Sequence, residues 1–173
     1  MINGNISLIE KRVRRLEVNF IRVLFFFPIL LMLINWETRT SISDFVYSEQ
    51  NWVFYLFFFT GALLFAFNGL VFKEHSYNLI LSILLLLIAI FKHKEQVYIH
   101  FISAGLFYIG SVAAMIIFSS AKQRKIKILF SLVTFLGLMG HFVFNFYNLF
   151  VAEWIGLLPI CLHFQLESQN KMD

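Results

Sequence analysis

Charged residues, cysteine and proline are all scarce in this sequence of 173 residues. Only 14% of the residues are charged, whereas a soluble globular domain carries about 25%. The single cysteine, Cys161, can form no internal disulfide and supplies no cysteine-based metal framework. With 2 Pro and 8 Gly, the chain is neither collagen-like nor of low complexity. These absences exclude a water-soluble globule and a disulfide scaffold.

What the sequence has in abundance is apolar surface. Hydrophobic residues make up 60% of the chain, including 23 Phe, and the mean hydropathy is +0.78. A membrane-spanning helix needs about 20 mostly apolar residues. Six apolar runs approach this length, namely 18–36, 52–72, 77–91, 97–118, 128–145 and 150–164. None of them alternates between apolar and polar residues as a strand of a membrane barrel does. The sequence therefore predicts an all-α membrane bundle of about six transmembrane helices over residues 18–165.

Two of these runs invite alternatives, and one contains a proline. The third and sixth runs are short, so they are either tilted spans, spans extended into their turns, or re-entrant segments. Pro28 lies in the first run, where it should kink the helix.

The distribution of Lys and Arg predicts the orientation. With six spans, 11 of the 14 basic residues fall on one side of the membrane, which marks that side as cytoplasmic. They lie mainly in the N-terminal segment 1–17 and the loop 119–127. Both termini are then cytoplasmic, with a tail at 166–173 and a long outer loop at 37–51. The net charge of +4 follows from this bias and requires no nucleic acid. The abundance of Phe, Ile, Asn and Lys indicates an AT-rich genome, so we expect the inner membrane of a bacterium.

Several polar side chains share one depth near the predicted outer ends of the last three helices. At 1.5 Å per residue, His100, His141 and Glu153 all lie within about 6 Å of an outer helix end. Polar groups inside a membrane are costly and are functional candidates. We therefore predict a lipid headgroup pocket facing the outer leaflet, formed by His100, Ser103, His141, Asn145, Asn148, Glu153 and Trp154. The competing interpretation is that these residues only join helices to one another.

Other features carry smaller predictions. The outer loop 37–51 is long enough to cover such a pocket, and its aromatic residues Phe45 and Tyr47 should be shielded from water. Asn68, Asn78 and His163 come to a comparable depth on the cytoplasmic side. Trp36, Trp52 and Trp154 fall at the predicted outer boundary, where indole rings prefer to lie. Close helix contacts are expected at Gly61, Gly69, Gly105, Gly110, Gly137, Gly140 and Gly156.

Short motifs resemble a known family. The helix around Ile99–Tyr108 is similar to the H-x-x-x-A-x-x-F-F/Y helix of the FRAG/DRAM/Sfk group, through His100 and Ala104. Glu153-Trp154 resembles the E-W start of that group's last helix, and Ser43-Asp44 resembles part of its first outer loop. Where that loop has a Pro-Glu pair, this sequence has Ser48-Glu49. The resemblance implies a six-helix protein concerned with membrane lipids or membrane trafficking, without an established active site.

Three functional classes follow. The first is a non-catalytic membrane protein that interacts with lipids, requires no cofactor and has a membrane-protein partner or forms a homo-oligomer. The second is a zinc-dependent lipid hydrolase of the ceramidase type, with His100, His141 and Glu153 as ligands. The third is a small transporter or channel subunit. Because the sequence has no H-E-x-x-H pair, no G-x-S-x-G elbow and no P-loop, the first class is favoured.

Overall fold

A computed structural model describes residues 8–72, 75–118 and 121–169. Of Ile9 it describes the backbone only. In this part of the chain every regular element is helical, which confirms the all-α class. The elements are α1 (Leu8–Phe25), α2 (Phe27–Asn35), the 3-10 turn η1 (Ser43–Tyr47), α3 (Asn51–Val71), α4 (Asn78–Ile90), α5 (Val97–Ala113), the π-helical turn η3 (Ala114–Phe118), α6 (Arg124–Phe142) and α7 (Leu149–Ser168).

The lengths of the helices are those of a membrane bundle. Among the described residues, 4 helices are long and apolar enough to cross a membrane, and a fifth span results if α1 and α2 count as one. The third predicted run, which is short in the sequence, corresponds to α4, and this helix has only 13 residues. The sixth run is longer than predicted, because α7 has 20 residues and continues to Ser168. Six spans and the sidedness of the termini remain predictions.

Pro28 breaks the first run instead of only kinking it. The pyrrolidine ring would collide with the carbonyl of Leu24 in a continuous helix. The helix therefore ends at Phe25 and begins again at Phe27, with Pro28 in the first turn of α2, where its missing N–H costs nothing. The axes of the two pieces differ by 56°. The N-terminal boundary expected at residue 17 falls inside α1, which is continuous from Leu8.

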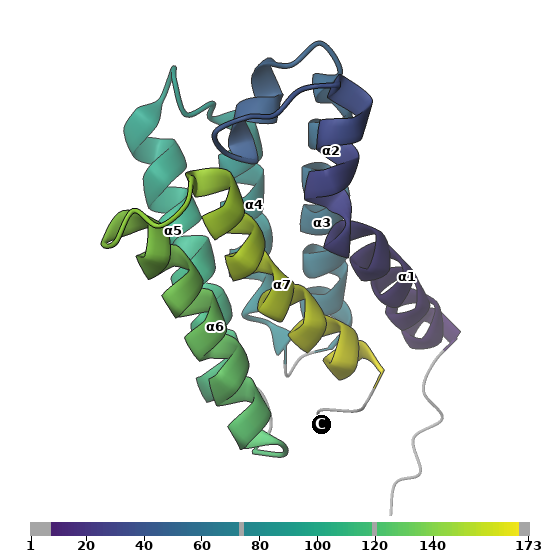
Figure 1. The fold of residues 1–173 in the computed structure, drawn as a ribbon. Coiled ribbons are helices and arrows are strands. Elements are labelled where there is room, and N and C mark those ends of the chain that lie inside the picture. The colour runs from purple at the N-terminus through teal and green to yellow at the C-terminus, as the bar shows by residue number, and fades with distance from the viewer. Residues whose placement is uncertain (1–7, 73–74, 119–120, 170–173) are drawn as a thin grey trace, which may run out of the picture.

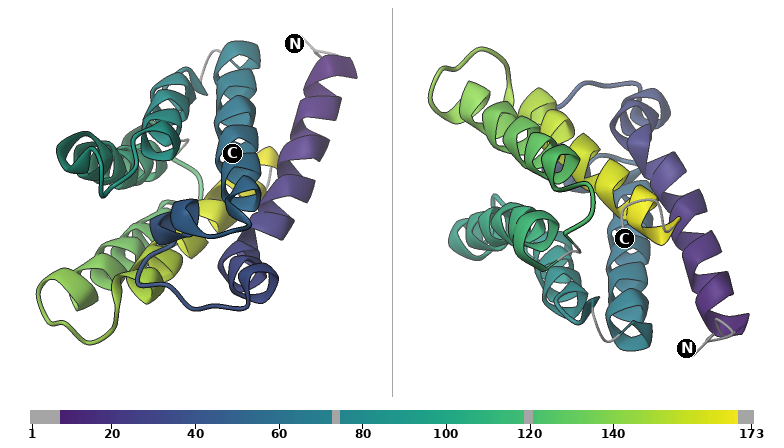
Figure 2. Two further views of the ribbon diagram at one scale, coloured as in Figure 1. Left: turned by 90° about the horizontal axis from the view of Figure 1, so that it is seen from above. Right: turned by 90° about the horizontal axis from the view of Figure 1, so that it is seen from below.

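From α2 onward, successive helices reverse direction, so their connections lie at two ends of the bundle (Figure 1). We call the end with residues 36–50, 91–96 and 143–148 the loop end. The opposite end carries the start of α1, the start of α6 and the end of α7, and we call it the basic end. Helices α6 and α7 form a hairpin, and α7 also packs against α1 on its other side (Figure 2).

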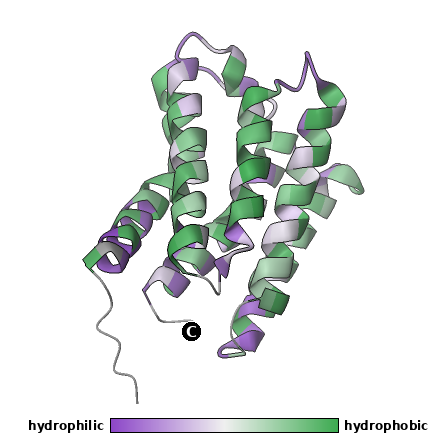
Figure 3. Cartoon of the chain, turned by 180° about the vertical axis from the view of Figure 1, so that it is seen from behind, coloured by the Kyte–Doolittle hydropathy of each residue, from purple (hydrophilic) through white to green (hydrophobic). Residues whose placement is uncertain are grey.

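The outward faces of the helices are apolar as well. Large hydrophobic side chains such as Leu63, Phe67, Ile109 and Leu136 are more than half exposed. Figure 3 shows hydrophilic residues concentrated on α1 and at the two ends, with hydrophobic residues over the lengths between them. A surface of this kind is suited to lipid and not to water, so the chain is a multi-pass membrane protein.

Candidate functional site

The segment between α2 and α3 lies across the loop end and closes it. Ile42, Phe45 and Val46 are almost completely buried there, and the Phe45 ring lies 6.2 Å from that of Phe150. Burying these side chains removes them from water, which stabilises the closed arrangement. The prediction that this loop packs over the bundle is confirmed, although Tyr47 is only partly buried.

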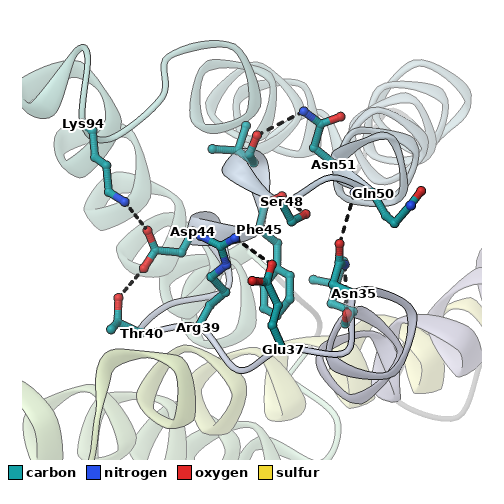
Figure 4. Close-up of polar contacts among 12 residues, drawn as sticks. Asn35, Glu37, Arg39, Thr40, Asp44, Phe45, Ser48, Gln50, Asn51 and Lys94 are labelled. Carbon is teal, nitrogen blue, oxygen red and sulfur yellow. Dashed lines mark hydrogen bonds and ion pairs between the residues drawn. The ribbon is translucent and has the colours of Figure 1, made fainter.

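Hydrogen bonds to the helix ends fix the path of this segment (Figure 4). The Asn35 side chain accepts from the Gln50 amide at 3.2 Å, and the Asn51 side chain donates to the Val46 carbonyl at 3.3 Å. The Phe150 amide donates to the Thr40 carbonyl at 2.8 Å. The segment is thereby attached to α2, α3 and α7.

A charged cluster joins the same segment to the α4–α5 connection. Asp44 accepts from Thr40, and its Oδ1 lies 3.1 Å from His93 Nε2 and 3.2 Å from Lys94 Nζ. Burial raises the pKa of Asp44, but the Thr40 hydrogen bond and the nearby cations outweigh it and leave that pKa below its ordinary value. Burial also lowers the pKa of His93, and the nearby Asp44 carboxylate offsets only part of this effect. At neutral pH the cluster therefore pairs a carboxylate with Lys94 and a neutral imidazole.

Glu153, in the first turns of α7, points beneath this segment. Its Oε2 accepts from the Ile42 amide at 2.6 Å. Its partner is therefore a backbone N–H of the covering segment, and not a His or Asn side chain of the predicted pocket. Tyr108 on α5 donates to the Glu153 carbonyl at 3.2 Å, which ties α5 to α7 at the same level.

His100 lies on the opposite side of this region, at the start of α5. It is only 3% exposed, and its Nδ1 donates to the Phe91 carbonyl at 2.7 Å. Its ring lies 5.5 Å from that of His93, which connects it to the Asp44 cluster. Ser103, one turn further along α5, is equally buried.

His100 and Glu153 both line an elongated internal cavity. The cavity contains about 1110 Å³ of empty space, open solvent included, and lies between α1, α3, α4, α5 and α7. On α7 its lining extends from Glu153 to Ser168, a rise of about 22 Å along the helix. Its middle is formed by apolar side chains such as Phe57, Leu85 and Phe107.

Polar groups occur at the two ends of the cavity. At the loop end they are Ser43, His100 and Glu153. At the basic end Glu17 accepts from Asn68 and from Ser168, each at 2.7 Å, and Asn78 donates to Asn68 at 2.8 Å. Polar contacts of this kind hold α1, α3, α4 and α7 together.

The remaining predicted site residues do not join His100 and Glu153. His141 Nδ1 donates to the Tyr147 carbonyl at 2.7 Å, Asn145 has a φ of 51° at the end of α6, and Asn148 caps α7 by accepting from the Val151 amide at 3.1 Å. These three residues build the α6–α7 turn, and none lines the cavity. The prediction of one pocket shared by His100, His141, Asn145 and Glu153 is therefore wrong.

Trp154 does not line the cavity, and the three predicted zinc ligands do not come together. Trp154 is partly buried and donates to the Phe25 carbonyl at 3.4 Å, whereas Trp36 and Trp52 are exposed at the loop end. No group of three His, Cys, Asp or Glu side chains suited to a metal occurs among the residues that the structure describes. His100, His141 and Glu153 do not form the proposed zinc site.

Only part of the polar network at the two ends of the cavity can be predicted from the sequence. Asn68 and Asn78 were expected at one depth, but Glu17 lay in a segment assigned to the cytoplasm. Asp44 and His93 belong to two separate loops, and nothing in either loop indicates the other. The contact between them depends on the way the helices pack.

A comparison with family models identifies one match. A family of unknown function (DUF7103) matches residues 26–168. The chain belongs to the DUF7103 family. The matched region begins at the break before α2 and ends with α7, so it contains every cavity residue except those on α1. No curated protein and no solved structure matches this DUF7103 chain.

Proposed function

We propose that this DUF7103 protein is a non-catalytic membrane protein that binds a membrane lipid in its internal cavity. The apolar chain lies along the middle of the cavity, and the polar part lies near His100 and Glu153. The Glu153 carboxyl group suits hydroxyl and ammonium groups as partners, so the headgroup is zwitterionic or rich in hydroxyls and is not a bare phosphate.

The observation that carries this proposal is the separation of polar and apolar lining within one cavity. Ligand sites are mostly apolar, with a few polar groups that fix the orientation of the ligand. This cavity has the same character, because its middle is apolar and its polar groups are confined to its ends. A lipid has the same division between chain and headgroup.

The resemblance to the FRAG/DRAM/Sfk group supports the same function. His100, Ala104 and Glu153, three of the four positions that carry the resemblance, line the cavity. Members of that group are linked to lipid remodelling and membrane trafficking, so a lipid is also the ligand that the resemblance implies.

A matched pair of variants tests the proposal. Ala104 lines the cavity, whereas the next residue, Gly105, is exposed and has open space where a Cβ would lie. Ala104→Trp should remove the lipid that co-purifies with the detergent-extracted protein, measured by mass spectrometry. Gly105→Trp should retain it. Equal retention by two folded variants would show that the cavity is not the site, and the smaller Ala104→Leu serves if Ala104→Trp fails to fold.

Glu153→Gln tests the headgroup assignment. The amide oxygen can still accept from Ile42, so the covering segment should stay in place. Replacement of the carboxyl group by an amide should change the class of retained lipid, while thermal stability changes little. A fall in stability with no change in lipid would make Glu153 a structural residue only.

The proposed location is the inner membrane of a bacterium, with both termini in the cytoplasm. Glu49 and Lys125 are exposed at opposite ends of the bundle, whereas Ser48 is buried. Cysteines at Glu49 and Lys125 should react with an impermeant thiol reagent from opposite sides of intact cells. The native Cys161 is buried and provides the unlabelled background.

One observation favours a transporter as a second candidate. Transporters commonly contain interrupted helices around a central site, and the α1–α2 pair is interrupted beside a cavity with a carboxylate at each end. Movement of lipid or solute across vesicles containing the purified protein distinguishes the two, because a binding protein alone produces no flux.

A further inference from the structure

Helix α1 has one face in the bundle and one face free. Val13, Glu17 and Ile21 are buried at intervals of four residues, which is the face toward α3 and α7. On the free side, Leu8 and Leu16 are more than half exposed, with the exposed Arg12 between them and Lys11, Arg15 and Arg22 along one edge. A helix that exposes both leucine and several basic side chains is typical of a membrane surface.

The basic edge borders an open groove between α1 and the end of α7. The residues lining it are Arg14, Arg15, Val18, Asn19, Arg22 and Ser168. Three of the six are arginines, and none is acidic. Arg14 is anchored here by donating to the Glu167 carbonyl at 3.4 Å and by lying 4.6 Å from the centre of the Phe72 ring.

Arg15 and Arg22 have no such anchors. Within the described part of the chain neither guanidinium group makes a hydrogen bond, an ion pair or a ring contact. Ser168, which lines the groove, donates to Glu17, and the other oxygen of that carboxyl group accepts from Asn68. Among the described residues no carboxylate therefore pairs with Arg15 or Arg22.

The bend between α1 and α2 keeps these arginines near the membrane surface. Arg22 follows Arg14 by eight residues, which in a straight span would place it about 12 Å deeper. Because α1 is inclined by 56° to α2, the difference in depth along the α2 axis falls to about 7 Å. Arginine side chains cover such a distance by extending toward the surface.

From this geometry we infer a second lipid site, in which the α1–α7 groove binds the phosphate of an anionic phospholipid at the basic end. Planar guanidinium groups pair with phosphate oxygens in a bidentate manner, and the exposed Leu8 and Leu16 on the same helix offer apolar contacts to a lipid. The site shares only Ser168 with the internal cavity and is independent of the proposed function.

The test compares two charge-matched double variants of the full-length protein. Arg15→Gln/Arg22→Gln removes two charges from the groove, and Lys122→Gln/Lys125→Gln removes two exposed charges elsewhere at the same end. Binding of phosphatidylglycerol and phosphatidylcholine is measured in uncharged detergent by native mass spectrometry. Each basic residue near an anionic surface contributes roughly fivefold in affinity, so the arginine variant should bind phosphatidylglycerol about 30-fold more weakly.

The lysine variant should lose less than about threefold, and phosphatidylcholine binding should not change in either. Equal losses in the two variants would indicate general charge attraction and overturn the site. Absence of a preference for phosphatidylglycerol in the wild type would do the same. Inorganic phosphate should not displace the lipid, and displacement would reassign the groove to a soluble anion. Ala104→Trp should keep phosphatidylglycerol at the groove, which separates this test from that of the cavity.

Discussion

The contact between α6 and α7 offers a sharp test of how this bundle is packed. A Cβ added at Gly137 would lie 2.5 Å from Ile155 Cγ2 and 3.1 Å from Ile155 Cβ. The first distance is too short for two carbons, so Gly137→Ala forces the helices apart. Gly105, on α5, has no atom within 4 Å of the same hypothetical Cβ, and Gly105→Ala is the matched control.

The two variants share the gain in helix propensity, about 1 kcal/mol for Gly to Ala. They differ in the collision, and overpacking a closely packed site costs about 1–3 kcal/mol. Gly137→Ala should therefore be less stable than Gly105→Ala by about 1–3 kcal/mol. The free energy of unfolding is measured by titration with a denaturing detergent in mixed micelles, followed by circular dichroism.

A double variant identifies the cause. Ile155→Ala removes the Cγ2 atom that collides, so Gly137→Ala/Ile155→Ala should recover stability beyond the sum of the single changes, with a coupling of about 0.5–3 kcal/mol. Zero coupling, or equal stability of Gly137→Ala and Gly105→Ala, would refute close approach of α6 and α7 at this level.

Two further predictions concern the loop end. Phe45→Ala should destabilise the protein by about 3–5 kcal/mol because Phe45 is fully buried, whereas Phe59→Ala, at a 39% exposed position, should cost far less in the same titration. The pKa of His93 in the folded protein lies below its ordinary value of 6.5. The contribution of the neutral imidazole to the free energy of unfolding is therefore complete above pH 6.5 and is lost as the pH falls through the folded pKa. Hydrogen exchange of residues 41–48, corrected for intrinsic rates, should accelerate between pH 7.5 and 5.5, and His93→Gln should reduce that acceleration; an unchanged pH dependence in the variant would assign it to another group.

The all-α class was predictable because it depends on composition alone. Long apolar runs must satisfy their backbone hydrogen bonds internally in a membrane, which requires helices. The break near Pro28 was predictable in position, since a proline acts on its own local backbone. Its 56° angle was not, because the packing of α1 against α3 and α7 sets that angle.

Depth along the helices was a weaker guide than composition. It correctly placed His100 and Glu153 near one end, but residues at one depth can point in any direction around their helices. Glu153 points into the cavity, while His141 turns back to its own loop. Likewise six of the seven glycines predicted at close helix contacts meet a neighbouring helix or loop, and Gly105 faces open space.

The sequence by itself therefore determined the helices, their apolar surfaces and the segregation of basic residues, because these follow from local composition and the periodicity of one chain segment. The tertiary structure decided which polar groups meet. Asp44 reaches His93 and Lys94, Glu153 reaches Ile42, and Glu17 reaches Asn68 only after helices distant in sequence have packed together. The cavity between those helices has the same origin: it is a space that no single segment encodes.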